Sequence, residues 1–160
     1  MVPMIQEHLI STSRIAWPIK ALNRLASEEM LVEVLKSCLD FGEVAFDQAK
    51  IDKNYDILCY LLDYSLPGYA RELAHFLSYH DERVRFAAVE VLVEQEGDGE
   101  VADILEPYLT DVSSENTRIH QAAVEAFVKH KWPIKDKSAV MASPIVNQFK
   151  IAKEGFLQPI

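Results

Sequence analysis

Apolar residues recur every three or four positions along most of this chain, with polar residues between them. The clearest segment is residues 82–96, where the apolar set is Val84, Ala87, Ala88, Val91 and Leu92. In residues 115–131 the same spacing is kept by Ile119, Ala122, Ala123, Ala126 and Phe127. Because this spacing places each set on one face of an α-helix, it predicts two amphipathic helices, each with one buried face.

The two predicted helices are copies of one another. Residues 83–93, shifted by 35 positions, align with residues 118–128, and six of the eleven pairs are identical. The helix expected before each copy aligns too, with an offset of 32. Self-similarity at such a period is typical of stacked helical hairpins. We therefore predict clear repeats over residues 69–97 and 99–131.

Residues 18–64 show the same kind of pattern more weakly and are predicted to form further helix pairs. Ser27 is the expected N-cap of one helix and Asp52 of another, because both side chains can accept hydrogen bonds from a first helical turn. A short helix is expected between these two, at residues 43–50. The helix after Asp52 is predicted to bury Tyr55, Leu58, Cys59 and Leu62.

Residues 135–160 differ in character from the repeats. A last helix is expected at residues 139–148, with Pro144 either in its first turn or breaking it. Phe149 and Ile151 then alternate with polar residues ahead of a turn-like Lys153-Glu154-Gly155 sequence, which predicts a short hairpin or an extended cap. Because the end of a repeat stack needs a cover, we interpret this segment as a capping tail. Residues 1–160 are expected to form a single all-α domain.

The charge is unevenly distributed along the chain. The net charge is −9, but residues 27–111 alone hold six Lys/Arg against twenty Asp/Glu, a net −14, whereas the two flanks are weakly basic. Nucleic-acid binding needs cations over phosphates, so the acidic repeats argue against a DNA or RNA partner. We find no signal-peptide pattern and no apolar run long enough for a membrane span. A soluble cytoplasmic protein is the expectation.

The sequence offers little for catalysis or for metal binding. Its five histidines form no His-Glu-x-x-His motif, and its two cysteines form no Cys-x-x-Cys motif. No Gly-x-Ser-x-Gly and no glycine-rich phosphate loop is present. We expect no catalytic residue, no cofactor and no metal. Cys38 and Cys59 both fall on apolar stripes and are expected to be buried, reduced thiols, although the sequence leaves a disulfide between them open.

The exposed side of the repeated helices is the best candidate for binding. Glu90 and Glu94 lie one turn apart, and Glu125 stands at the position equivalent to Glu90, so an acidic row could hold a basic partner. Beside it runs a second apolar stripe, which either packs against the adjacent repeat or forms an exposed groove. The candidate partner-binding residues are Phe86, Val89, Glu90, Val93, Glu94, Val124, Glu125 and Val128.

A basic run from Lys129 to Lys137 surrounds Trp132. It is interpreted either as a charged helix end on which the tryptophan packs as a lid, or as a contact for an acidic partner such as the middle of another copy of this chain.

Residues 69–131 resemble the HEAT repeat, in the bacterial form found in phycobilisome-lyase-type proteins. The matching residues are Asp81, Val84-Arg85 and Ala87-Ala88 in one copy and Leu105-Glu106-Pro107-Tyr108-Leu109 and Ala122-Ala123 in the next. The resemblance implies a right-handed α-solenoid of antiparallel helix pairs, with the second helices lining the concave surface. It also implies that Asp81 and Arg85 tie neighbouring repeats together, with His120 in place of the arginine in the last copy.

The preferred hypothesis for function is a non-enzymatic scaffold that binds a protein or peptide on the second helices; a basic partner is one that the acidic row could hold, and a solvated acidic face is the other reading of that row. The resemblance suggests an alternative, a lyase or lyase subunit acting on a protein-bound tetrapyrrole. A structural domain of a larger assembly is the third reading. The oligomeric state does not follow from the sequence.

Overall fold

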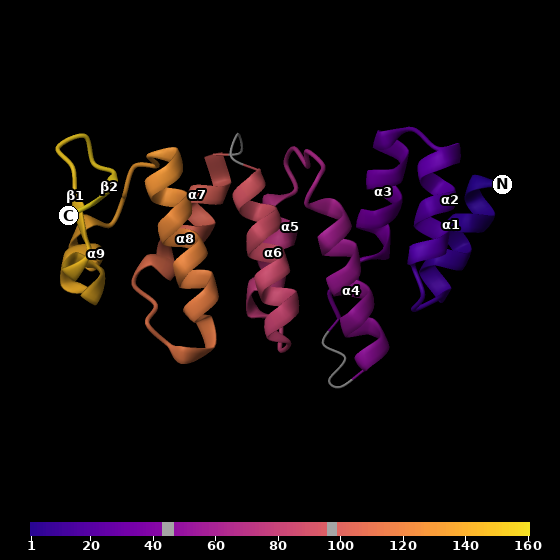
Figure 1. Ribbon diagram of the computed structural model, residues 1–160, viewed down its shortest axis with the longest axis horizontal. Helices are drawn as coiled ribbons and strands as arrows, with labels where there is room; N and C mark the ends of the chain where they lie inside the picture. The colour runs from indigo at the N-terminus through magenta and orange to yellow at the C-terminus, as the bar shows by residue number, and fades with distance from the viewer. Residues whose placement is uncertain (43–46, 96–98) are drawn as a thin grey trace.

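The computed structural model describes residues 1–42, 47–95 and 99–160. Within these ranges the chain is mostly helical, and its helices stand side by side in a row from the N-terminus to the C-terminus (Figure 1). The predicted all-α class is confirmed, with a small two-stranded sheet at the C-terminal end. No helix among the described residues is long and apolar enough to cross a membrane.

The N-terminal end is a cluster of three mutually packed helices, α1 (Val2–Ser11), α2 (Ala16–Leu25) and α3 (Glu28–Cys38). Leu9, Leu22 and Leu35 are fully buried in this cluster. Ser27 caps α3 as predicted, because its side chain accepts a hydrogen bond from the backbone N–H of Met30.

Helix α4 (Gln48–Leu61) packs against α3 and α6. It begins five residues earlier than predicted, because Asp47 rather than Asp52 accepts hydrogen bonds from the first-turn N–H groups. The expected cap at Asp52 is therefore wrong. Residues 43–46 of the predicted 43–50 helix lie outside the described residues, and Asp47 precedes the first helical residue.

The burial predicted for α4 and for the cysteines needs a correction. The buried face of α4 is Ile51, Asn54, Ile57, Leu58 and Leu61. Cys59 is exposed and Cys38 is buried, and both thiols are free. The predicted buried face included neighbouring positions that lie at the surface of α4. Periodicity gives the direction of a buried face but does not show which residues mark its edges.

Each of the two segments predicted as clear repeats contains a short first helix followed by a longer second helix. The first repeat is α5 (Ala70–Ala74), which continues as a 3₁₀ turn, η1 (His75–Ser78), followed by α6 (Glu82–Glu94). The second is α7 (Gly99–Leu105), which continues as η2 (Glu106–Leu109), followed by η3 (Ser114–Asn116) and α8 (Thr117–His130). The predicted stop around Gly97 and Asp98 lies outside the described residues.

The helices of the repeats lie in two layers. In Figure 1, α4, α6 and α8 stand in front, and α5 and α7 stand behind them. Helix α6 packs against α4 on one side and α8 on the other, and against α5 in the second layer. Ala88 and Ala123 are both fully buried, and such small residues let neighbouring helices approach closely.

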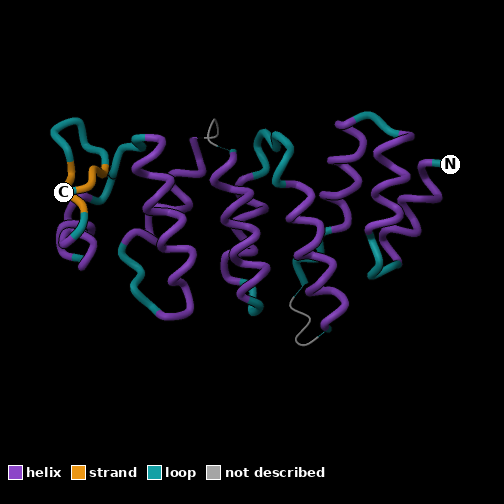
Figure 2. Tube along the Cα trace, in the orientation of Figure 1, coloured by secondary structure: helices purple, strands orange, loops and turns teal. Residues whose placement is uncertain are grey.

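The C-terminal tail is a compact cap on α8. It contains α9 (Lys137–Ala142), η4 (Pro144–Asn147) and the antiparallel strands β1 (Phe149–Ile151) and β2 (Leu157–Pro159), drawn in orange in Figure 2. The predicted hairpin is confirmed, and Gly155 supplies its turn with φ +92°. Pro144 ends α9 and opens η4, so the predicted single helix is broken there.

Aromatic packing and hydrogen bonds to backbone N–H groups help to hold this cap in place. Trp132 stacks on His130 and meets the edge of Phe127, so the tryptophan packs as a lid at the end of α8. One carboxylate oxygen of Glu106 accepts hydrogen bonds from the backbone N–H groups of Lys135 and Asp136, at 2.9 and 2.7 Å. The packing interpretation of the basic run is thus supported, and β2 lies against α8.

Tyr69 makes the stability of this fold sensitive to alkaline pH. It lies just before α5, with the ammonium of Lys36 over its ring, 4.5 Å from the centroid. Burial raises the pKa of Tyr69 to about 12, and the charges of Glu72 and Glu33 act in the same direction.

We therefore expect this tyrosine to destabilise the protein between about pH 10 and about pH 12. The folded state holds the phenol proton more tightly than the unfolded chain, so the stability contribution is complete below about pH 10 and is lost as the pH rises towards 12. The expected loss is about 1 kcal/mol, reduced from the full linkage value because the side chain is only partly buried. Urea denaturation at about pH 9 and about pH 11.5 would measure it, and Tyr69→Phe should lose less stability over that interval.

Candidate functional site: a groove between the second helices

Helices α4, α6 and α8, which we call the second helices, share one register, defined by a comparable hydrogen bond on each of them. One polar side chain on each helix donates a hydrogen bond to a backbone carbonyl at the end of the preceding helix. The three bonds are Asn54 Nδ2 to Asp40 O at 2.9 Å, Arg85 Nη1 to Tyr79 O at 2.8 Å, and His120 Nδ1 to Tyr108 O at 2.8 Å. Sequence comparison paired Arg85 with His120 but missed Asn54, because the flanking residues of α4 differ.

The residues predicted to tie neighbouring repeats behave in different ways. Arg85 does reach the next repeat, since its Nη2 donates to the carbonyl of Glu115 at 3.1 Å. Asp81 contacts Arg83 rather than Arg85, and it caps α6 by accepting from the backbone N–H groups of Arg83 and Val84. His120 binds within its own repeat. The predicted acid–base pair is thus replaced by contacts to backbone carbonyls.

A second tie, which the sequence analysis did not identify, links each second helix to the one before it. Arg83 pairs with Asp52 of α4 at 3.0 Å, and its guanidinium lies over the Tyr55 ring, 5.6 Å from the centroid. The equivalent Arg118 pairs with Glu82 of α6 at 3.5 Å and lies 5.4 Å from the centroid of Phe86. The identity of Arg83 and Arg118 across the repeat is the signal that marked this contact.

A groove of about 590 Å³ lies between α6 and α8, bordered by the end of α4. Its apolar lining is Leu62, Phe86, Val93, Ala122 and Ala126. Its polar lining is Glu90, Glu94, Arg118, Gln121, Glu125 and Lys129. We call this surface the α6–α8 groove.

The groove brings together five of the eight predicted partner-binding residues: Phe86, Glu90, Val93, Glu94 and Glu125. Two others need a correction, because Val89 is 0% exposed and Val124 is 6% exposed, so both belong to the core. Val128 is partly buried against the same core and does not line the groove. The second apolar stripe is therefore split, with one part packed between helices and one part open.

Negative charge dominates the centre of the groove. Among the described residues, no hydrogen bond or ion pair joins the carboxylate of Glu90 or Glu94 to another side chain, whereas Glu125 accepts a hydrogen bond from Gln121 at 2.9 Å. Although Cys59 is exposed as a residue, partial burial of its thiol raises the pKa; the hydrogen bond with Tyr55 lowers this pKa, and the charges of Asp56 and Glu90 raise it.

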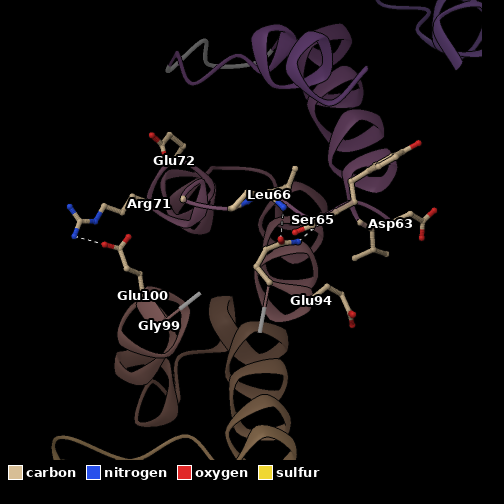
Figure 3. Close-up of a pocket in the computed structure, with 13 residues that line it drawn as sticks. Asp63, Ser65, Leu66, Arg71, Glu72, Glu94, Gly99 and Glu100 are labelled. Atoms are coloured by element: carbon tan, nitrogen blue, oxygen red, sulfur yellow. Dashed lines mark hydrogen bonds and ion pairs between the residues drawn. The ribbon is translucent and has the colours of Figure 1, made fainter. Parts of the chain in front are cut away.

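A larger hollow, of about 980 Å³, lies where α4 leads into α5 and α6 leads towards α7. Arg71 and Glu100 form an ion pair on one side of it, and Asp63 and Glu94 lie on the opposite side (Figure 3). The side chain of Gln95, a buried residue, also lines the hollow. It accepts a hydrogen bond from Leu66 N at 2.7 Å and donates one to Tyr64 O at 3.1 Å. Gly99 of this lining directly follows residues 96–98, which lie outside the described residues, so we assign no site to this hollow.

The described part of the chain holds no group of three or more His, Cys, Asp or Glu side chains arranged to bind a metal ion. No protein-family model matches this chain, and neither a curated protein nor a solved structure shows significant similarity to it. The function must therefore be argued from the α6–α8 groove itself.

Proposed function

We propose that this protein is a HEAT-like helical-repeat scaffold, a right-handed α-solenoid that acts by binding a basic protein or peptide rather than by catalysis. The shared register of α4, α6 and α8, with equivalent hydrogen bonds at Asn54, Arg85 and His120, supports a stack of like units. The two free thiols support a reducing, cytoplasmic location.

The observation that carries the binding proposal is the composition of the α6–α8 groove. Its apolar side chains can contact a partner's aliphatic residues, and Glu90 and Glu94 have carboxylates without an ion-pair partner among the described residues. A carboxylate beside an apolar surface is best satisfied by a lysine or arginine whose aliphatic stem covers that surface. The partner we propose therefore combines apolar side chains with basic ones.

The test uses a fluorescein-labelled amphipathic peptide of about 14 residues, long enough to follow the groove, with leucine on one face and lysine beside it. Replacing Glu90, Glu94 and Glu125 together by glutamine is expected to weaken its binding about 10- to 100-fold, since each lost charge pair costs about 0.5–1 kcal/mol. Fluorescence anisotropy at about 0.1 M salt would measure the Kd.

A matched control removes the same number of charges elsewhere. Glu7, Glu29 and Glu154 are exposed and lie outside the groove, so replacing these three by glutamine changes the net charge from −9 to −6, as the groove variant does. The control should bind the peptide within about twofold of the original protein. Equal weakening by the two variants would show a net-charge effect and would rule out the groove.

No contact among the described residues favours the tetrapyrrole alternative. Bilins carry propionate carboxylates, which the side chains of Glu90 and Glu94 would repel. A basic peptide requires a negatively charged surface and an anionic pigment requires a positively charged one. The carboxylates of Glu90 and Glu94 therefore favour the peptide.

A further inference from the structure

The α6–α8 groove has the length and direction of a helix-binding site. Its lining on α8 extends from Arg118 near the N-terminus to Lys129 near the C-terminus, a distance of about 16 Å or three helical turns. The two walls run in the same direction (Figure 1), and the ion pair between Arg118 and Glu82 holds their N-terminal ends together.

The shape of the groove favours a helix over an extended strand. Ala122 is partly exposed on α8, whereas Ala126, one turn further on, is 1% exposed, and the small side chain of Ala122 leaves room for a larger side chain on a partner. An extended strand would need partners for its backbone N–H and C=O groups, and the apolar lining offers none. The one amide in the lining, that of Gln121, already donates to Glu125. In a helix, by contrast, most backbone N–H and C=O groups form hydrogen bonds with one another.

The charges along the groove are polarised. The dipoles of α6 and α8 have their positive ends at the N-terminal end of the groove, where Arg118 lies in its ion pair with Glu82. Glu90, Glu94 and Glu125 place negative charge along the middle of the groove, and Lys129 adds one positive charge at the other end, where the dipoles of α6 and α8 are negative. A bound helix with its C-terminus near Arg118 and its basic residues over the glutamates would match both regions.

Resting on the function proposed above, we infer that the partner segment is an amphipathic helix of about three to four turns that binds antiparallel to α6 and α8. Its lysines or arginines lie in its N-terminal half, spaced four residues apart to meet Glu90 and Glu94. Its C-terminal end, which carries the negative end of its dipole, contacts Arg118. Its leucine-like side chains contact Ala122, Phe86 and Val93.

Three labelled peptides of about 14 residues test this arrangement. The forward peptide has lysines in its N-terminal half, a glutamate near its C-terminus and an apolar face. The reversed peptide has the same residues in the opposite order. The third is the forward peptide with a central proline, which prevents a continuous helix. Anisotropy gives each Kd, and circular dichroism reports helix formation on binding.

The forward peptide is expected to bind about tenfold more tightly than either of the other two and to gain helicity on binding. Arg118→Gln should reduce the difference between the forward and reversed peptides while leaving the reversed peptide little changed. Equal binding of forward and reversed peptides would overturn the orientation, and equal binding of the proline peptide would overturn the helix. If all three bind equally and still depend on the groove glutamates, the proposed function stands without this inference. If none of the three peptides binds, both the proposed function and this inference are wrong.

Discussion

Replacing Ala88 by arginine is expected to unfold the centre of this protein. Ala88 is fully buried on α6, the helix that packs against α4, α5 and α8. An arginine there must push these helices apart or carry a charge into an apolar interior without a partner. The expected cost is about 4 kcal/mol or more, a large part of the roughly 5–15 kcal/mol that stabilises a typical domain. Urea denaturation followed by circular dichroism would measure it.

Glu90→Arg is the matched control, because it introduces the same side chain on the same helix two residues further on. Glu90 is exposed in the groove, so the change in stability should stay within about 1 kcal/mol. If both variants had the same denaturation midpoint as the original protein, the assigned inward face of α6 would be incorrect.

The second large effect is expected at Asn54, which is 1% exposed in the middle of α4. Its side chain accepts a hydrogen bond from Asp40 N and donates one to Asp40 O, both at 2.9 Å, and lies 3.4 Å from the hydroxyl of Tyr79. Asn54→Leu keeps the volume but leaves both backbone groups of Asp40 without their partner. We expect a loss of about 2–4 kcal/mol in unfolding free energy.

Gln48→Leu provides the comparison for Asn54→Leu. Gln48 is exposed on the same helix and, among the described residues, its side chain bonds to Asp52 alone, so the loss should be below about 0.5 kcal/mol. Equal denaturation midpoints for the two leucine variants would show that the Asp40 hydrogen bonds contribute no net stability.

Local signals predicted the elements of this protein well. Helices α6 and α8 were predictable because their apolar residues recur at helical spacing, and Asp81 and Ser27 cap where their side chains can reach first-turn N–H groups. The hairpin was predictable from the alternation at Phe149 and Ile151 and from the turn at Gly155. These signals act over a few residues and need no distant partner.

The composition of the groove was only partly predictable. Glu90 and Glu94 were placed correctly on the open face, yet Val89 and Val124 were assigned to the same surface and are buried. A helix with neighbours on two sides and in a second layer buries a wider arc than the stripe of an amphipathic helix packed on one face. Periodicity gives the direction of the buried face but not its width.

The sequence by itself determined the helical elements, their repetition and the acidic character of the central helices, because spacing, capping and charge are properties of neighbouring residues. The tertiary structure decided which side chains meet across units. Arg83 contacts Asp52 and Tyr55, and Arg118 contacts Glu82 and Phe86, across separations of about thirty residues that no local pattern encodes. It also decided that the α6–α8 groove stays open, since that depends on how closely two helices pack and on which residues lie between them.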